Sequence, residues 1–214
     1  MVETLVLNID ETQAKDGMSV FGRIAKRTFD IVASLLGILL LSPLYLFLAI
    51  KVKRQKDGPV FYRQERIGKG GKPFHILKFR TMKEGYEDEM HPQLTVRNEG
   101  NLTRSGKLLR ENHLDELPQL WNVLVGDMSF VGPRPERQYF IDKIMQENSD
   151  YEQLFQIRPG ITSMATIYNG YTDTMEKMLI RLQMDLDYLR KRSLALDAKI
   201  LFATLRLLLN GKKI

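Results

Sequence analysis

The sequence predicts a mainly helical (mainly α) protein with a small antiparallel β element, a re-entrant membrane hairpin of two helices, and interfacial amphipathic helices beside a cytoplasmic domain. Three observations predict this fold class: an uncharged apolar stretch interrupted by a proline, apolar residues that recur at helical spacing, and two short β-like runs around a glycine cluster. They divide the chain into a tail at 1–20, an interfacial segment and hairpin at 21–54, a cytoplasmic domain at 55–192 and an amphipathic interfacial helix at 193–214.

The composition limits the kinds of site that the chain can carry. The 214 residues suffice for one domain with a core, and the lack of cysteine excludes disulfides, thiol nucleophiles and cysteine-ligated metals. Lys and Arg outnumber Asp and Glu by 32 to 26, and the net charge of +6 suits a phosphate-rich partner such as anionic lipid or a nucleotide. Residues 1–20 are acidic and lack an unbroken apolar core, so we expect a flexible tail or a short peripheral element rather than a signal peptide.

Residues 31–50 form the predicted membrane segment. They carry no charge, and as one straight helix these 20 residues would extend about 30 Å, roughly one hydrocarbon thickness. Pro43 removes a backbone donor and clashes with the Leu39 carbonyl, so we expect the helix to break or kink there. The Ser42 hydroxyl can donate to a carbonyl one turn back and partly relieve the break. Each arm would then have about ten residues, about 15 Å, the depth of one leaflet.

Charges at both ends of this segment set its expected topology. The flanking basic residues are Lys26 and Arg27 before it, and Lys51, Lys53 and Arg54 after it. Because cytoplasmic flanks of membrane segments are enriched in Lys and Arg, we expect both ends in the cytoplasm and a hairpin that enters and leaves by one face. The alternative is a kinked helix that crosses the membrane and places residue 1 outside the cell.

The part between the hairpin and the last helix mixes one β hairpin with helices. Residues 60–64 and 74–79 are β-like runs on either side of a turn rich in glycine, and the polar residues 83–101 predict a long mobile loop. A helical pattern passes through Leu108, pauses near Asn112 and restarts at Asp115. A further helix is predicted by an apolar stripe made of Met175, Met178, Leu179, Leu182, Leu186 and Leu189.

Two amphipathic segments are expected at the membrane surface. Residues 193–214 are almost continuously apolar apart from one basic stripe, which favours the interface slightly over an ordinary core helix. The stripe repeats every seven residues, at Arg192, Lys199, Arg206 and Lys213. Residues 21–29 lead directly into the hairpin and are the second such segment.

Asp115 and Glu116 are the first candidates for chemistry. Asp115 looks like the N-cap of a helix that tolerates Pro118 in its first turn, and Glu116 would lie at the positive end of the same helix. That position favours the ionised form of both carboxylates and attracts anions or metal-bound phosphate. Because an adjacent Asp-Glu pair is common on protein surfaces, a capped helix is the simpler interpretation without further context.

Arginines near turns and element ends provide that context. They are Arg80, Arg104, Arg110, Arg134 and Arg158. Guanidinium groups at such positions can converge on one cleft and grip phosphate oxygens in bidentate fashion. Pro133 and Pro135 restrict the backbone around Arg134 and orient its side chain, and Pro159 does the same more weakly for Arg158. The alternative is a scatter of surface arginines.

Taken together, the motifs resemble those of the bacterial sugar transferase family, the monotopic polyprenyl-phosphate phosphoglycosyl transferases that start lipopolysaccharide, capsule and glycoprotein glycans. The resemblance covers about residues 26–208, and the chain is similar to the minimal form of the family, without additional N-terminal transmembrane helices. The matching motifs, in order, occupy residues 26–30, 42–43, 58–61, 78–82, 114–123, 126–129, 132–136 and 158–162.

The resemblance implies a two-step reaction. Asp115 would attack the β-phosphorus of a UDP-sugar, release UMP, and carry the phosphosugar until polyprenyl (undecaprenyl) phosphate accepts it. Glu116 would be the metal ligand for Mg²⁺. The implied phosphate clamp consists of Arg110, Arg134 and Arg158, supported by Lys78 and Arg80. The catalytic domain would lie on the cytoplasmic face of the bacterial inner membrane, with the bilayer as a partner and no nucleic acid; a homodimer is left open.

Two other readings remain. The first is a non-catalytic membrane adaptor that binds anionic lipids, which explains the charge and the hairpin but gives no purpose to the ordered motifs. The second keeps the enzyme but transfers the phosphosugar in one direct step, which would need no covalent intermediate. Many relatives have Gly-Trp-Ala-Gln after the Arg-Pro-Gly-Ile-Thr motif. This chain lacks that Trp and Gln in residues 163–170, so the donor sugar does not follow from the resemblance. Asp185 matches a recurring aspartate of the family, although a solvated helix face explains it equally well.

Overall fold

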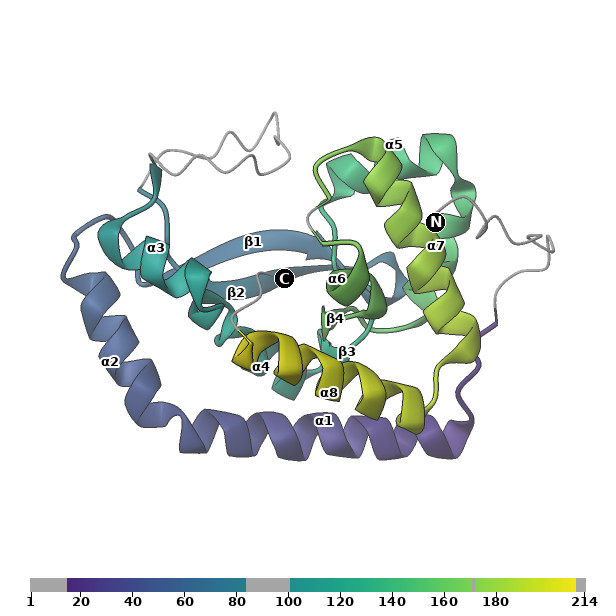
Figure 1. Ribbon diagram of the computed structural model, residues 1–214, viewed down its shortest axis with the longest axis horizontal. Helices are drawn as coiled ribbons and strands as arrows, with labels where there is room; N and C mark the ends of the chain where they lie inside the picture. Colours follow the sequence, from purple (N-terminus) through teal and green to yellow (C-terminus); the bar gives the residue numbers. More distant parts are fainter. Residues whose placement is uncertain (1–14, 84–100, 171, 211–214) are drawn as a thin grey trace.

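A computed structural model describes residues 15–83, 101–170 and 172–210, and it shows a mostly helical fold with two small two-stranded sheets (Figure 1). The long helix α1 (Val20–Leu40) runs along one edge of the molecule, and the sheets and the remaining helices lie on one side of it. Most of the tail at 1–20 and of the loop expected at 83–101 falls outside the described residues.

The predicted break of the apolar segment is confirmed. Helix α2 (Ser42–Lys53) follows α1 after a bend of 63°, and the Ser42 hydroxyl donates to the Leu39 carbonyl at 2.8 Å. The first arm is longer than the ten residues expected, because residues 21–29 and the start of the apolar segment form one helix of 21 residues. Among the described residues, α1 and α2 have the length and composition of a membrane span only when taken together, and no helix meets that test alone.

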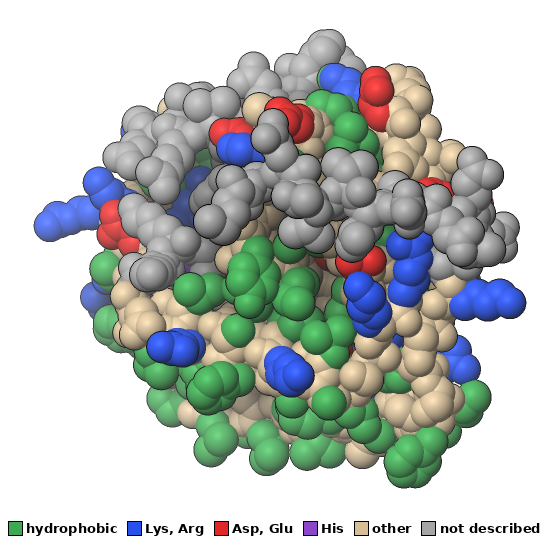
Figure 2. All heavy atoms as spheres, turned by 45° about the vertical axis from the view of Figure 1, so that its right-hand side comes forward, with side chains coloured by type: hydrophobic (Ala, Val, Ile, Leu, Met, Phe, Trp, Pro, Cys, Tyr) green, Lys and Arg blue, Asp and Glu red, His purple; other side chains and the backbone are tan. Residues whose placement is uncertain are grey.

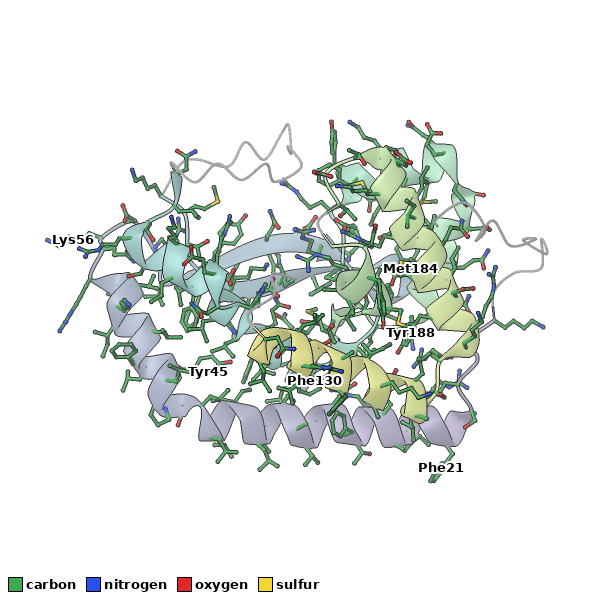
Figure 3. The ribbon with its side chains drawn as sticks, viewed as in Figure 1. Phe21, Tyr45, Lys56, Phe130, Met184 and Tyr188 are labelled. Carbon is green, nitrogen blue, oxygen red and sulfur yellow. The ribbon has the colours of Figure 1, made fainter. Side chains whose placement is uncertain are left out.

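Helix α1 buries its polar side and exposes its apolar side. Gly22, Lys26, Asp30 and Ser34 recur every four residues and face the rest of the protein. Large exposed apolar side chains occupy the opposite face of α1 and continue on α2: Val20, Phe21, Ile24, Val32, Leu35, Leu36, Leu39, Leu40, Leu46, Phe47 and Ile50. Figure 2 shows hydrophobic side chains gathered along the lower edge, and Figure 3 shows Phe21 pointing away from the domain. A helix on a water-exposed surface has the opposite arrangement, so this face suits lipid.

The predicted β hairpin is confirmed, and a second sheet was not predicted. Strands β1 (Phe61–Ile67) and β2 (Pro73–Phe79) pair antiparallel around the short turn η1 (Lys69–Gly71). Strands β3 (Ser129–Val131) and β4 (Gly160–Thr162) form a parallel pair of three residues each. Gly160 is required there, because a Cβ atom at this position would lie 2.1 Å from the backbone nitrogen of Gly132.

The main core lies between the β3–β4 pair and the C-terminal helices. It is built by α5 (Gln138–Glu147), the 3-10 segment η4 (Ser149–Gln156), α7 (Met175–Lys191) and α8 (Leu194–Leu209). The remaining helices are the short α3 (Arg104–Glu111), α4 (Gln119–Val125) and α6 (Met164–Tyr168). The apolar stripe predicted for α7 is confirmed, since Met178, Leu182, Leu186 and Leu189 are all buried.

Helix α8 forms as predicted, but its basic stripe does not continue as expected. Arg192 precedes the helix and is buried, with its Nε 3.5 Å from an Asp16 carboxylate oxygen, so only Lys199 and Arg206 are exposed; Lys213 lies outside the described residues. The helix is held to its neighbours by buried polar contacts at Asp197 and Thr204. It still presents an exposed apolar set beside that of α1: Leu194, Phe202, Leu205, Leu208 and Leu209.

Candidate active site

Asp115 and Glu116 lie in a short 3-10 turn, η3 (Leu114–Glu116), between α3 and α4. The preceding His113 has a φ of 54°, a left-handed conformation that turns the chain after α3. Helix α4 begins only at Gln119, with Pro118 at its N-cap. The predicted N-cap role of Asp115 is therefore wrong, and its carboxylate makes no capping hydrogen bond.

Glu116 is held in its ionised form by two cations. Its Oε1 lies 2.6 Å from Lys78 Nζ and 3.9 Å from Arg134 Nη2. Burial alone would raise the pKa of this carboxyl, but Lys78 and Arg134 outweigh burial and lower the pKa to about 2. Glu116 is thus a permanent negative charge whose position is set by strand β2 and by the loop after β3.

Asp115 has the opposite electrostatic environment. Only 7 % of the residue is exposed, and burial raises the pKa of its carboxyl above the ordinary value, with the neighbouring Glu116 adding to the rise. Lys78 and Arg110 act in the other direction. The sequence predicted that the positive end of a helix would favour the ionised form of both carboxylates. Glu116 is ionised, but because of Lys78 and Arg134, and the prediction is wrong for Asp115. Two adjacent carboxylates with divergent pKa values are typical of functional sites.

The predicted phosphate clamp is only partly assembled around these carboxylates. Lys78 and Arg134 face Glu116, and Arg110 is an electrostatic neighbour of Asp115 while its Nε donates to Thr81 Oγ1 at 3.1 Å. Two other members donate to backbone carbonyls instead, Arg80 Nε to Pro59 at 2.9 Å and Arg158 Nε to Gly126 at 2.7 Å. Arg104 is the exposed first residue of α3.

Helix α4 follows the two carboxylates in the sequence. It is held in place by Asn122, a residue for which the sequence predicted no role. The Asn122 side chain accepts from the Leu77 N–H at 3.0 Å and donates to the His75 carbonyl at 2.8 Å, which joins α4 to the strand that carries Lys78. Asn122 belongs to the motif at 114–123, but one of two polar residues in a mostly apolar helix gave no further signal. Its contacts hold α4 against the strand that carries Lys78.

The helix pair α1 and α2 contacts the chain at both ends of α4. Tyr45 of α2 donates its hydroxyl to the Leu117 carbonyl, just before the helix. Arg27 of α1 donates to the carbonyls of Val123 at 2.7 Å and Leu124 at 2.9 Å, in the last turn, where helix carbonyls lack intrahelical partners. The carboxylate pair is therefore built directly onto the hairpin.

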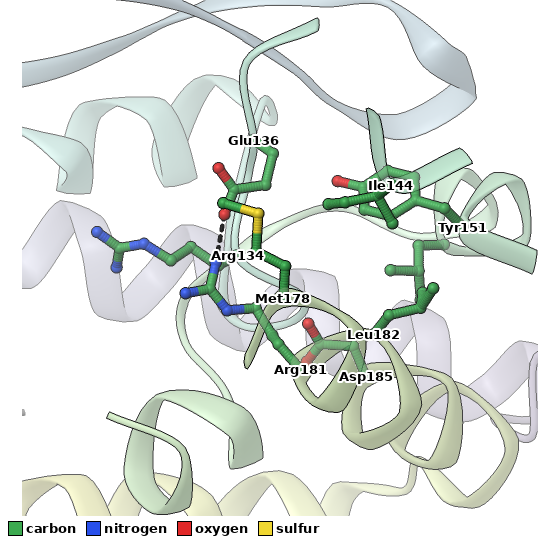
Figure 4. A pocket seen from close by; sticks show the side chains of 9 residues that line it. Arg134, Glu136, Ile144, Tyr151, Met178, Arg181, Leu182 and Asp185 are labelled. Atoms are coloured by element: carbon green, nitrogen blue, oxygen red, sulfur yellow. Dashed lines mark hydrogen bonds and ion pairs between the residues drawn. The ribbon is translucent and has the colours of Figure 1, made fainter. Parts of the chain in front are cut away.

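A second buried carboxylate lies away from this pair. Asp185 on α7 is 2 % exposed, and its Oδ1 has no hydrogen-bond partner among the described residues. It lines a small cavity with Arg134, Glu136, Tyr151 and Arg181 (Figure 4). Burial raises the pKa of Asp185 to about 7, in spite of the nearby Arg181, so the solvated role that the sequence left open for Asp185 is wrong.

The raised pKa predicts a pH-dependent effect of Asp185→Asn on stability. In the unfolded chain Asp185 ionises near pH 4, whereas in the folded protein it keeps its proton up to about pH 7, so ionisation opposes folding increasingly between those values. We therefore expect the change in melting temperature caused by Asp185→Asn to be more positive at pH 8 than at pH 5. Thermal unfolding of both proteins at the two pH values measures it; an equal change at both would contradict the prediction.

The two carboxylates suit a metal ion that is shared with a phosphate ligand. In the described part of the chain, no three His, Asp or Glu side chains cluster in a way that could hold a metal by themselves. Mg²⁺ is usually bound through one or two carboxylates together with substrate phosphates, so an ionised Glu116 beside Asp115 is an appropriate donor set.

Comparisons with known proteins agree with these features. Residues 21–211 match the bacterial sugar transferase family. The chain is 40 % identical over 186 residues to a UDP-N-acetylgalactosamine-undecaprenyl-phosphate N-acetylgalactosaminephosphotransferase of Aeromonas hydrophila, with 87 % of this chain and 44 % of the relative covered. It is 43 % identical over 189 residues to a UDP-glucose:undecaprenyl-phosphate glucose-1-phosphate transferase of Escherichia coli, with 87 % and 40 % covered. An exopolysaccharide production protein of Rhizobium leguminosarum is 38 % identical over 189 residues, with 85 % and 93 % covered. The chain thus spans less than half the length of the first two relatives.

Proposed function

Because this chain belongs to the bacterial sugar transferase family, we propose that it transfers a phosphosugar from a UDP-sugar to undecaprenyl phosphate and releases UMP. The observation that carries the proposal is the pair of carboxylates, in which a buried Asp115 adjoins a Glu116 held by Lys78 and Arg134. The names of the two sugar-transferring relatives support the donor class and the acceptor, although they differ in the sugar. This step would begin a bacterial surface glycan, in line with the exopolysaccharide relative.

The proposed reaction has two displacements at one phosphorus atom. An Asp115 carboxylate oxygen attacks the β-phosphorus of the UDP-sugar, the bond from that phosphorus to the bridging oxygen breaks, and UMP leaves. A phosphate oxygen of undecaprenyl phosphate then attacks the phosphorus of the aspartyl phosphosugar, which forms the diphosphate product and frees Asp115. Lys78, Arg110 and Arg134 bind the diphosphate oxygens and screen the negative charge that would otherwise repel the carboxylate.

We propose Glu116 as the residue that would hold Mg²⁺. The ion, when bound, would supply charge neutralisation for the leaving UMP. Lys78 and Arg134 keep the Glu116 carboxylate ionised, which is the form that binds a metal ion.

We propose that α1 and α2 form a re-entrant hairpin in the inner membrane, with the catalytic domain on the cytoplasmic face. The exposed apolar side of α1 and α2, continued by α8, supports a lipid-facing surface. Arg27 and Tyr45 of the hairpin contact α4 directly, so both arms remain on the side of the catalytic domain. The head group of a long-chain phosphate at the bilayer surface would then lie near Asp115.

The re-entrant topology predicts that both flanks of the hairpin are on the same side of the membrane. Since the chain has no cysteine, Lys15→Cys and Arg54→Cys each introduce a single thiol at an exposed position. In intact cells, an impermeant maleimide should label neither thiol, and in inside-out vesicles it should label both. Labelling of residue 15 but not 54 in intact cells would establish the kinked transmembrane alternative.

The function is tested by measuring UMP release from a panel of UDP-sugars by purified protein in lipid nanodiscs with undecaprenyl phosphate. We expect turnover with one or a few donors, loss of turnover with EDTA, and recovery when Mg²⁺ is added back. Release from no donor by protein that still binds anionic vesicles would favour the membrane adaptor instead.

A further inference from the structure

A cluster of ion pairs, formed by Glu136 with Arg66 and Arg181, adjoins the Pro-Arg-Pro turn that carries Arg134. This cluster is the ionic bracket. Glu136, two residues after Arg134, is 8 % exposed and is gripped on both carboxylate oxygens. Arg181 of α7 donates to Oε1, and Arg66 of β1 donates to Oε2 at 3.3 Å. Figure 4 shows Arg181 and Glu136 joined, with the Arg134 guanidinium pointing away from them. Arg66 and Arg181 therefore both bind Glu136, while the Arg134 guanidinium extends away from Glu136 and Arg181.

The same bracket also fixes the backbone of the turn. Arg66 Nη1 donates to the Pro135 carbonyl at 3.1 Å, and the Glu136 carbonyl accepts from the Ile67 N–H at 3.0 Å. On the other side of Arg134, the Pro133 carbonyl accepts from the Gly160 N–H at 2.8 Å. The backbone is thus held before and after Arg134, while the Arg134 side chain is 38 % exposed and its Nη2 lies 3.9 Å from Glu116 Oε1.

Burying the charged groups of the bracket costs desolvation free energy, and a role in packing alone would not require charged side chains. The Arg181 and Arg66 side chains are only 12 % and 18 % exposed. Burial lowers the pKa of Arg66 to about 10 and also lowers that of Arg181, and Glu136 opposes both shifts. Replacing such a buried ion pair with apolar residues is often neutral or stabilising, so its presence is better explained by what the ions hold in place.

We propose that Glu136 and Arg181 are positioning residues that act through Arg134. They hold the Arg134 guanidinium beside Glu116, where it would bind the phosphate oxygens of the substrate. This inference rests on the proposed function and extends it to two residues on elements remote in sequence from the carboxylate pair. Arg181 does not touch the substrate; its contribution is lost whenever Arg134 is absent.

A double-mutant cycle tests this dependence. The variants are Arg181→Met, Arg134→Ala and the combination, with Arg181→Lys as the conservative variant and Asp187→Asn, an exposed member of α7, as the matched control. Two quantities are measured for each: kcat/KM for UMP release, and the Kd for UDP with Mg²⁺, which needs no turnover. We expect Arg181→Met to lower kcat/KM and weaken UDP binding about tenfold, Arg181→Lys to restore part of both, and Asp187→Asn to change neither.

The decisive result is the effect of Arg181→Met in the Arg134→Ala background. We expect a further loss of less than about twofold, because residues that act as a unit are strongly non-additive. Independent losses that multiply would overturn the proposal. If Arg181→Met does not fold, the same cycle is run with Arg181→Lys. If wild-type protein releases no UMP, the proposed function fails, and the cycle on UDP binding still decides whether Arg181 acts through Arg134.

Discussion

We expect Asp115→Asn to lower UMP release by at least about 10³-fold and to leave the fold intact. The amide has the shape of the carboxyl group but is no nucleophile toward phosphorus, so the first displacement fails. Because burial already raises the pKa of Asp115, a neutral isostere at this 7 % exposed position is no harder to bury than the native side chain. Steady-state UMP release with the donor identified from the panel measures the loss, and a thermal melt confirms that the variant is folded.

A trapping experiment distinguishes transfer through a covalent aspartyl intermediate from direct one-step transfer. The loss of activity in Asp115→Asn alone would not distinguish them. Without undecaprenyl phosphate, wild-type protein incubated with donor and Mg²⁺ should gain the mass of one phosphosugar on the peptide that contains Asp115. Asp142→Asn, an exposed residue of α5, serves as the control and should behave like wild type. Loss of turnover in Asp115→Asn without any adduct in wild type would favour direct one-step transfer, and wild-type turnover by Asp115→Asn would remove Asp115 from the chemistry.

Features encoded by neighbouring residues could be predicted from the sequence. Pro43 breaks the apolar segment, and the Ser42 hydroxyl takes the hydrogen bond expected of it. The β hairpin and the stripe of α7 follow from patterns of two and about 3.6 residues. The predicted N-cap role of Asp115 is wrong, and the reason is also local. The chain completes a 3-10 turn first, and Pro118 then starts α4 without a side-chain cap.

Features that depend on contacts remote in sequence could not be predicted. The β3–β4 pair joins two segments of three residues, too short to show a period, and its parallel pairing depends on the close approach of Gly132 and Gly160. The clamp implied by the resemblance grouped Arg158 with Arg134, and both stand beside prolines. Only the fold shows that Arg158 contacts the Gly126 carbonyl at the far end of α4. Likewise, nothing in the sequence pairs Glu136 with Arg181.

The hairpin formed by α1 and α2 is part of the scaffold of the candidate active site, in addition to the membrane role proposed for it. Tyr45 and Arg27 contact α4 at its two ends, and Asn122 in the middle joins α4 to β2. Any tilt of the hairpin is therefore transmitted to the segment that carries Asp115. In the proposed reaction, whose acceptor would enter from the bilayer, this connection would set the height of Asp115 relative to the lipid head groups.

Replacing Asp197 by Ala destabilises the protein by about 3–5 kcal/mol, because it leaves a buried charge without its partner. Lys26 Nζ of α1 lies 2.6 Å from Asp197 Oδ2, and both side chains are at most 10 % exposed. The other oxygen, Oδ1, accepts from the Tyr188 hydroxyl at 2.6 Å; burial raises the pKa of Tyr188, so the hydroxyl stays protonated. Chemical denaturation in detergent, followed by circular dichroism, measures the change in the free energy of unfolding.

The double variant Lys26→Met with Asp197→Leu shows why Asp197→Ala is expected to lose stability. The cause is either the lost attraction between the two ions or the buried Lys26 charge left without a partner. It removes both ions and fills the space with apolar side chains, so we expect it to recover most of the stability that Asp197→Ala loses. Lys26 belongs to α1 and Asp197 to α8, so a recovered stability with reduced UMP release would mean that the pair serves mainly to orient α1. Failure of the double variant to recover would instead show that the ion pair itself stabilises the junction, contrary to the argument from desolvation.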